Sequence, residues 1–247
     1  MRAPSDSISA PPLPVLEWIN VAMLRMDQQV GRPVLVEFFD VCRSNSHRTL
    51  PYLRAWHERY AESGLRIMGM HCGAYPPSQD PAFVRDEVER LDLGYAVGLD
   101  VEWRAWKQFD APGWPARYLF DQKLRLFEYH LGEGGYAETE AAIGELLGQA
   151  VVPVPPLRPE DAPDVVLVEP TREAAGAYAG AYGAGGVHVV VSGTGELVVD
   201  GEARTITRPG LHTLVEHAVH TEATIAIEAG LGVEVHATQF TPGLDPD

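Results

Sequence analysis

Two cysteines are the residues of this sequence best suited to chemistry. Cys42 and Cys72 are the only cysteines among the 247 residues. A thiolate is the nucleophile of thiol–disulfide exchange, and a helix N-terminus or a neighbouring cation stabilises it. Arg43 and His47 follow Cys42 closely and are candidate positive neighbours. Three interpretations stay open: a lone reactive Cys42, a Cys42–Cys72 dithiol pair, or two small buried hydrophobic residues.

Histidines in the C-terminal part are the other candidates for chemistry. His217 and His220 are three residues apart, which does not fit the two-residue period of one strand face. A zinc site would need further ligands held in place by their own partners. We therefore expect no metal and no other cofactor. The five histidines of this part are His188, His212, His217, His220 and His236.

The charge of the chain excludes several classes of partner. There are 19 Lys and Arg residues against 35 Asp and Glu residues, a formal net charge of -16. Binding to nucleic acid requires basic residues that neutralise phosphates, and a polybasic membrane anchor requires the same. No leader pattern and no apolar run of membrane-spanning length is present. We expect a cytoplasmic protein with neither nucleic acid nor a membrane as its partner.

A proline-rich stretch divides the chain. Residues 151–163 hold five prolines, which cannot continue a helix or a central strand. We predict a domain over residues 1–150, a stiff linker over 151–163 and a second domain over 164–247.

Strand and helix patterns alternate in the first part, which predicts an α/β domain with a mixed sheet. The continuous apolar run 34–39 is typical of a strand buried on both faces. Apolar residues at helical spacing predict a helix over 16–26. The other predicted strands are 65–71, 95–100, 116–121 and 124–130, and the other helices are 49–60, 81–91, 101–109 and 137–147.

Short alternating runs predict an all-β sandwich, jelly-roll-like, in the second part. Asp200-Gly201 is a hairpin turn signal between two of them. The seven predicted strands are 165–168, 186–191, 195–199, 203–207, 210–216, 221–227 and 233–240.

Three segments of the first part carry a family resemblance. The first is 34–39, followed after ten residues by Leu-Pro-Tyr-Leu within 48–53. The second is Gly-Trp-Pro-Ala-Arg-Tyr-Leu-Phe-Asp at 113–121. The third is the segment 131–140. Over roughly residues 13–148, the sequence resembles TlpA- and DipZ-like thioredoxin-fold proteins. The second part is similar to the small sandwich of DipZ-like proteins, which looks like a carbohydrate-binding module.

The resemblance implies a thioredoxin-like fold of the thiol–disulfide oxidoreductase lineage. It also implies a cis peptide bond before Pro115, beside which a protein or peptide partner docks. It places Cys42 and Cys72 at the carboxyl ends of adjacent parallel strands, close enough for a disulfide to be conceivable. The predicted binding residues are Arg43, Ser46, Trp114 and Pro115.

The sequence departs from this family at its central motif. The positions of the family's Cys-x-x-Cys hold Arg43-Ser44-Asn45-Ser46, and a serine cannot replace sulfur in disulfide exchange. We therefore predict a degenerate active site and a binding or structural role. The alternative is a redox protein that uses Cys42 alone or with Cys72.

Aromatic residues suggest packing more than ligand binding. Trp103, Trp106 and Trp114 cluster in the sequence and are expected to pack at the core and its rim. The second part contains Tyr178, Tyr182 and Phe240 but no tryptophan, which argues against a sugar-binding surface. We expect the sandwich to form interdomain or homodimer contacts.

Overall fold

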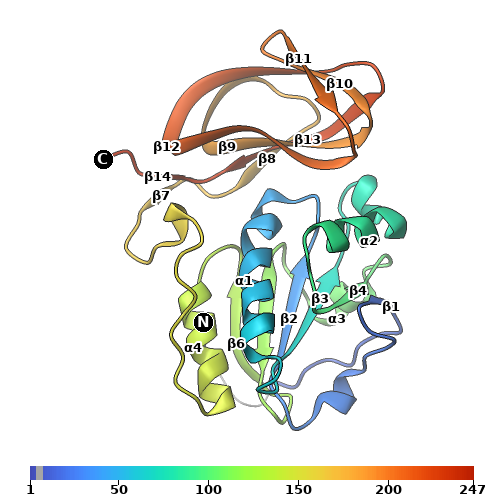
Figure 1. Ribbon diagram of the computed structural model, residues 1–247, viewed down its shortest axis with the longest axis vertical. Coiled ribbons are helices and arrows are strands. Elements are labelled where there is room, and N and C mark those ends of the chain that lie inside the picture. Colours follow the sequence, from blue (N-terminus) through green and yellow to red (C-terminus); the bar gives the residue numbers. More distant parts are fainter. Residues whose placement is uncertain (4–7) are drawn as a thin grey trace. The chain divides into compact units, whose positions relative to one another are not determined.

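The computed structural model describes residues 1–3 and 8–247 (Figure 1). Its contacts group the chain into two compact units, which we describe one at a time. The first contains residues 1–41, 46–73 and 79–155, and the second contains 42–45, 74–78 and 156–247. The domain limits predicted above, 1–150 and 164–247, stay predictions. Within the described residues, no helix has the length and apolar character needed to cross a membrane.

A mixed six-stranded sheet forms the centre of the first unit, in the order β1-β4-β3-β2-β5-β6. Strands β2, β3 and β4 are parallel to one another, whereas β1, β5 and β6 run antiparallel to their neighbours. All six residues of β2 are buried, as the continuous apolar run predicts. The strands are β1 Glu17–Ile19, β2 Val34–Phe39, β3 Arg66–His71, β4 Ala96–Leu99, β5 Ala116–Phe120 and β6 Leu126–Leu131.

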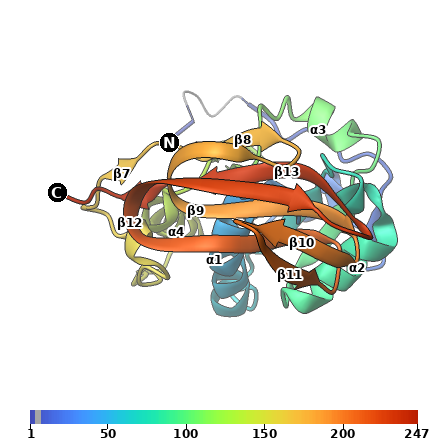
Figure 2. The ribbon, with the colours of Figure 1, turned by 90° about the horizontal axis from the view of Figure 1, so that it is seen from above.

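Helices cover both faces of this sheet. Side chains of Val34, Val36 and Phe38 pack against Ala105 and Phe109, beside α3. Helices α1 and α4 lie on the other side of the sheet from α3 (Figures 1 and 2). The α-helices are α1 Ser44–Tyr60, α2 Pro81–Arg90, α3 Arg104–Gln108 and α4 Tyr136–Leu147. The 3-10 helices are η1 Met26–Gln29, η2 Pro77–Gln79 and η3 Pro159–Asp161.

The helix predicted over residues 16–26 was wrong. Residues Glu17–Ile19 form β1 instead, which pairs antiparallel with β4. Asn20 ends this strand with φ 69°, in the left-handed region that interrupts a helix. Its side-chain amide donates to the carbonyl oxygens of Leu93 (2.6 Å) and Tyr95 (2.8 Å). These tertiary contacts outweigh the helical spacing of the apolar residues.

The C-terminal region of the second unit, from β7 onward, is all-β, as predicted. Its sheet has the order β11-β10-β12-β9-β13-β8, and β9 and β12 are long strands that curve side by side (Figure 2). Asp200 and Gly201 both have positive φ, as the predicted hairpin turn requires. The strands are β7 Leu167–Val168, β8 Arg172–Ala175, β9 Ala179–Gly193, β10 Gly195–Val199, β11 Glu202–Ile206, β12 Gly210–Ala229, β13 Val233–Thr241 and β14 Gly243–Leu244.

Two details of the strand prediction were wrong. The segments 210–216 and 221–227 were predicted as separate strands, but they form one continuous β12. Its pairing with β9 shifts register between Glu216 and Thr221, so the strand bends there without ending. The short strands β8 and β14 were missed, because two to four residues carry too little alternation to detect.

A buried ion pair links two central strands of the first unit. Glu37 of β2 lies opposite Arg117 of β5, and Arg117 Nε donates to Glu37 Oε2 (3.2 Å). The guanidinium also donates to Thr139 Oγ1 (3.2 Å) and to the carbonyl of Gly134 (3.1 Å). Glu37 is fully buried and Arg117 is 1% exposed. Burial raises the pKa of Glu37 to about 7, although the charge of Arg117 opposes the rise.

We predict that this carboxyl makes stability fall as the pH rises. Because the pKa of Glu37 is higher in the folded state, that state binds the proton more tightly between pH 4.5 and 7. The contribution of Glu37 to the free energy of unfolding is complete below pH 4.5. It is lost as the pH rises toward 7, by up to about 1.4 kcal/mol per pH unit. Glu37→Gln should remove this slope from the free energy of unfolding measured in urea. Glu58→Gln, at a side chain that is 67% exposed, should retain it. Equal slopes in Glu37→Gln and wild type would contradict the prediction.

Candidate functional site

The two cysteines follow adjacent parallel strands, as predicted. Phe39 at the end of β2 pairs with His71 at the end of β3, and the Cys72 amide donates to the Phe39 carbonyl (3.0 Å). Cys42 lies three residues beyond the end of β2. Both thiols are fully buried, and neither cysteine forms a disulfide. A thiol that solvent cannot reach is a poor nucleophile for an external disulfide.

The surroundings of Cys72 oppose formation of a thiolate. Its Sγ lies 3.5 Å from Oδ2 of Asp100 and 3.9 Å from the carbonyl of Met70. Burial raises the pKa of the Cys72 thiol far above its ordinary value, and the negative charge of Asp100 raises it further. Cys72 is therefore a neutral thiol at physiological pH.

Asp100 also binds the first turn of α3, the helix that contains Trp106. Its Oδ1 accepts from the amide of Arg104 (2.7 Å) and its Oδ2 from the amide of Trp106 (2.8 Å). These are two of the amides that a helix leaves unpaired at its N-terminus. One buried carboxylate thus joins Cys72 to the start of α3.

The positions that the resemblance assigns to the family's Cys-x-x-Cys hold other hydrogen-bonding groups. Ser46 is fully buried, and its Oγ accepts from the Asp40 amide (3.2 Å). Within the second unit, Ser44 begins α1, and its amide donates to Oε1 of Gln239 (2.7 Å). The Gln239 Nε2 donates to the carbonyl of Cys42 (3.1 Å) and to Tyr75 Oη (2.9 Å). A neutral carboxamide therefore occupies the start of this helix.

Arg43 is directed to a carboxylate of the same unit. Its Nη1 lies 3.4 Å from Oε2 of Glu173, and its guanidinium lies 5.2 Å from the centre of the Tyr75 ring. The Tyr75 hydroxyl donates to the same Glu173 carboxylate. Arg43, Tyr75 and Glu173 thus form one polar cluster in this unit.

His47, a candidate positive neighbour of Cys42, is not a cation in the structure. Burial lowers the pKa of His47, so the ring is neutral at physiological pH. Its Nε2 donates to the Val41 carbonyl (2.6 Å), and a carbonyl can only accept. The ring fixes the backbone before Cys42 and supplies no charge.

The cis peptide bond predicted before Pro115 is present, between Trp114 and Pro115. Pro115 is buried and directly precedes β5, whereas Trp114 is half-buried. The ring centre of Trp114 lies 4.4 Å from that of Trp106 and 5.2 Å from that of Trp103. The three tryptophans pack on one another, as expected. Nothing in these contacts tests the binding role predicted for Arg43, Ser46, Trp114 and Pro115.

Comparisons with known proteins support the thioredoxin-like fold that the resemblance implies. No family model matches the chain. Protein DipZ of Mycobacterium tuberculosis is 31% identical over 120 residues, which are 49% of this chain and 17% of DipZ. The thiol-disulfide oxidoreductase YkuV of Bacillus subtilis is 21% identical over 133 residues, 53% of this chain and 88% of YkuV. A solved thiol:disulfide interchange protein DsbE of Chlorobium tepidum matches with a TM-score of 0.52 at 14% identity, over 58% of this chain and 99% of that protein.

The first unit has a thioredoxin-like fold. The chain matches only about a sixth of the length of DipZ, so the resemblance concerns this domain and not the whole of that protein.

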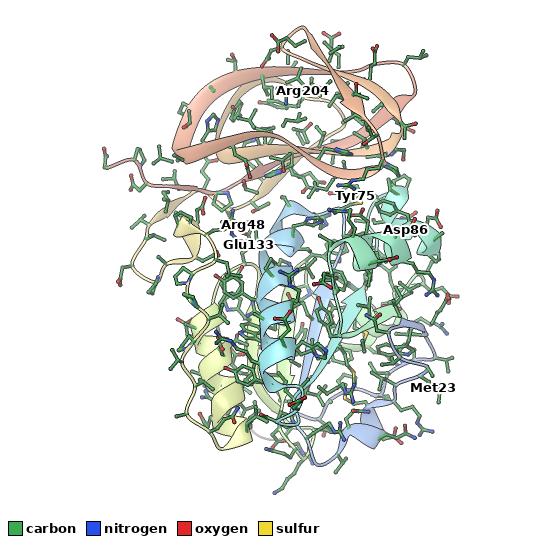
Figure 3. All side chains as sticks on the ribbon, viewed as in Figure 1. Met23, Arg48, Tyr75, Asp86, Glu133 and Arg204 are labelled. Carbon is green, nitrogen blue, oxygen red and sulfur yellow. The ribbon has the colours of Figure 1, made fainter. Side chains whose placement is uncertain are left out.

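An ion pair joins two elements of the first unit. Arg48 of α1 points toward Glu133 in the loop before α4 (Figure 3). Arg48 Nε donates to Glu133 Oε2 (2.5 Å), and both side chains are mostly buried. This pair ties α1 to the loop before α4.

The histidines and aromatic residues of the second unit have local partners. No group of three potential metal ligands occurs within residues 1–3 and 8–247. Tyr182 and Phe240 are 4% and 1% exposed, so they cannot present a flat surface to a sugar. The histidine contacts are His188 with Thr213 and Thr241, His212 with the Arg208 carbonyl, His217 with Tyr182, His220 with Glu222, and His236 with Ser192.

Sequence reasoning missed Asp100 and Gln239. Asp100 was placed correctly at the end of a strand, but its two roles depend on Cys72 and Trp106, which are distant in sequence. Gln239 lies in an alternating strand like its neighbours, so no local signal distinguishes it.

We predict that Asp100→Ala destabilises the thioredoxin-like domain by about 1–3 kcal/mol. The change leaves the amides of Arg104 and Trp106 without their acceptors in a partly buried region. Urea unfolding followed by tryptophan fluorescence measures this loss. Asp86→Ala, at an exposed position on α2, should change the free energy of unfolding by less than about 0.5 kcal/mol (Figure 3). Equal stabilities of the two variants would contradict the role of Asp100.

Proposed function

We propose that this chain is a thioredoxin-like module of the thiol–disulfide oxidoreductase lineage with a degenerate active site. In this proposal it does not exchange disulfides and serves instead as a binding or structural module. The observation that carries the proposal is the state of its sulfur atoms. The motif positions have none, and the two thiols of the chain are buried.

The chemistry of exchange supports this proposal. A thiolate must attack one sulfur of a disulfide, and a second sulfur must leave. Residues 43–46 offer a guanidinium, two hydroxyls and a carboxamide, none of which can take either role. Cys72 remains a neutral thiol because burial and Asp100 raise its pKa. These facts weigh against a Cys42–Cys72 pair as the redox centre.

The hydrogen bonds of the motif loop support a structural role. In a thioredoxin-type site the helix N-terminus stabilises the thiolate, since its amides and dipole favour negative charge. Here the amide of Ser44 donates to the neutral carboxamide of Gln239. That carboxamide also donates to the carbonyl of Cys42, so it binds the loop at the residues before and after Arg43.

As a binding module, the chain would take a protein or peptide partner at the face around Pro115. Trp114 and its two tryptophan neighbours provide half-buried aromatic surface next to it. Aromatic residues of this kind are enriched at protein interfaces. A homodimer through the second unit and a cytoplasmic location are further parts of this proposal.

Reduction of insulin by dithiothreitol tests the loss of redox function. The wild-type chain should not accelerate the reaction above the uncatalysed rate, and Cys42→Ser should leave the result unchanged. A thioredoxin-fold protein with an intact Cys-x-x-Cys serves as the positive control. Acceleration by the wild type that Cys42→Ser or Cys72→Ser abolishes would overturn the proposal and favour the redox alternative.

A further inference from the structure

Two arginines of the first unit lack the kind of partner that every other arginine of the chain has. Of the 19 basic residues, two are the lysines Lys107 and Lys123, and 17 are arginines. The guanidinium of nearly every arginine binds a carboxylate, a hydroxyl or a backbone carbonyl oxygen. The exceptions are Arg32 and Arg66, whose side chains form no hydrogen bond or ion pair with residues 1–3 or 8–247.

The two unpaired arginines are neighbours at one end of the sheet. Arg66 is the first residue of β3 and pairs with Val34, the first residue of β2. The backbone amide of Arg66 donates to the carbonyl of Pro33 (3.0 Å), the residue directly after Arg32. Burial lowers the pKa of Arg66, and the charge of Arg32 lowers it further. The folded protein therefore holds two positive charges close enough to repel each other.

Arg66 is half-buried, which makes the missing partner costly. Within the described part of the chain, its Nε is buried without an acceptor, whereas its two terminal nitrogens are open to solvent. A buried donor that loses its water and gains no acceptor costs free energy. Arg32 is exposed and adds a like charge where other arginines of the chain meet an acceptor. An anion on the terminal nitrogens would offset the repulsion between the two charges.

The other charged and titratable groups near Arg66 do not neutralise it. His57, in the last turn of α1, has its pKa lowered by burial, and the charge of Arg66 lowers it further. Glu58 opposes that shift, but its side chain is 67% exposed and lies beside Arg54. Among the described residues, no carboxylate oxygen lies within 4.0 Å of the guanidinium nitrogens of Arg32 or Arg66.

This arginine pair is remote from the positions that the resemblance assigns to the family's motif. Arg66 and Val34 begin two parallel strands. Phe39 and His71 end the same two strands, and Phe39 leads to the motif loop. The arginine pair and the motif loop therefore lie at opposite ends of the sheet, and the inference that follows does not depend on the proposed function.

We propose that Arg32 and Arg66 form a binding site for a phosphate group. Two adjacent guanidinium groups carry two positive charges, which a phosphate dianion neutralises and a carboxylate neutralises only in part. The N–H groups of a guanidinium also bind phosphate oxygens in pairs, which gives the contact a defined geometry. Inorganic phosphate and a phosphate monoester present the same group, and titration with each distinguishes the two sources.

Titration with sodium phosphate at constant ionic strength tests this proposal. The ¹H–¹⁵N correlation of the Arg66 Nε–H group, assigned with Arg66→Lys, should shift saturably as phosphate replaces chloride. That of Arg85, which is paired with Glu17, should not move. Tighter binding of phenyl phosphate than of inorganic phosphate identifies a monoester as the ligand, and the reverse order identifies the free ion. No saturable shift with either phosphate, or an equal shift with acetate, would overturn the proposal.

A matched pair of arginine variants tests the site through thermal stability. In chloride, Arg32→Gln should be no less stable than the wild type, because it removes the repulsion on Arg66. In phosphate, the wild type should gain stability by binding, and Arg32→Gln should gain less, since its affinity falls about tenfold or more. Arg85→Gln, at a paired surface arginine, should keep the full gain. Equal gains of Arg32→Gln and wild type would contradict the site, because the general salt effect of phosphate acts on all three proteins alike.

The titration of His57 provides a readout at a residue outside the arginine pair. The charge of Arg66 contributes to lowering the pKa of His57, and bound phosphate offsets that charge. The pKa of His57, followed by NMR, should therefore rise when phosphate replaces chloride at constant ionic strength. The rise should be smaller in Arg32→Gln, which binds phosphate more weakly. The same pKa of His57 in both salts would contradict phosphate binding beside Arg66.

Discussion

The buried Glu37–Arg117 pair is the constraint on which the thioredoxin-like domain depends. Truncating either side chain would leave the other polar group buried without its hydrogen-bond partner, which costs roughly 1–3 kcal/mol. The pair also lies close to two segments that carry the family resemblance. Glu37 is two residues before the end of β2, which leads to the motif loop, and Arg117 is two residues after the cis-linked Pro115. A core interaction thus keeps both segments in register even though the cysteines of the motif are absent.

Hydrogen bonds surround the positions at which the resemblance places the family's Cys-x-x-Cys. Ser46 binds the Asp40 amide, and the carboxamide of Gln239 binds the start of α1. The Cys72 thiol lies against the Asp100 carboxylate, which also supports α3 and the tryptophan cluster. These groups have the contacts of structural residues, which is why we propose a binding or structural role.

The parts of the fold that follow local patterns were predictable from the sequence. The buried run of β2 and the Asp200-Gly201 turn follow from residue types alone, whereas the cis bond at Pro115 required the family resemblance. The segment 16–26 has helical spacing, but pairing with β4 and the contacts of Asn20 decide its conformation. Asp100 and Gln239 were not predictable, because their roles depend on partners far away in the chain.

The accessibility of the two thiols decides between a redox protein and a degenerate one. Native protein is incubated with oxidised glutathione, and its intact mass is then measured without a reductant. The account predicts an unchanged mass, because Cys42 and Cys72 are fully buried and the pKa of Cys72 is raised. Addition of glutathione, or loss of two hydrogens through a Cys42–Cys72 disulfide, would contradict it.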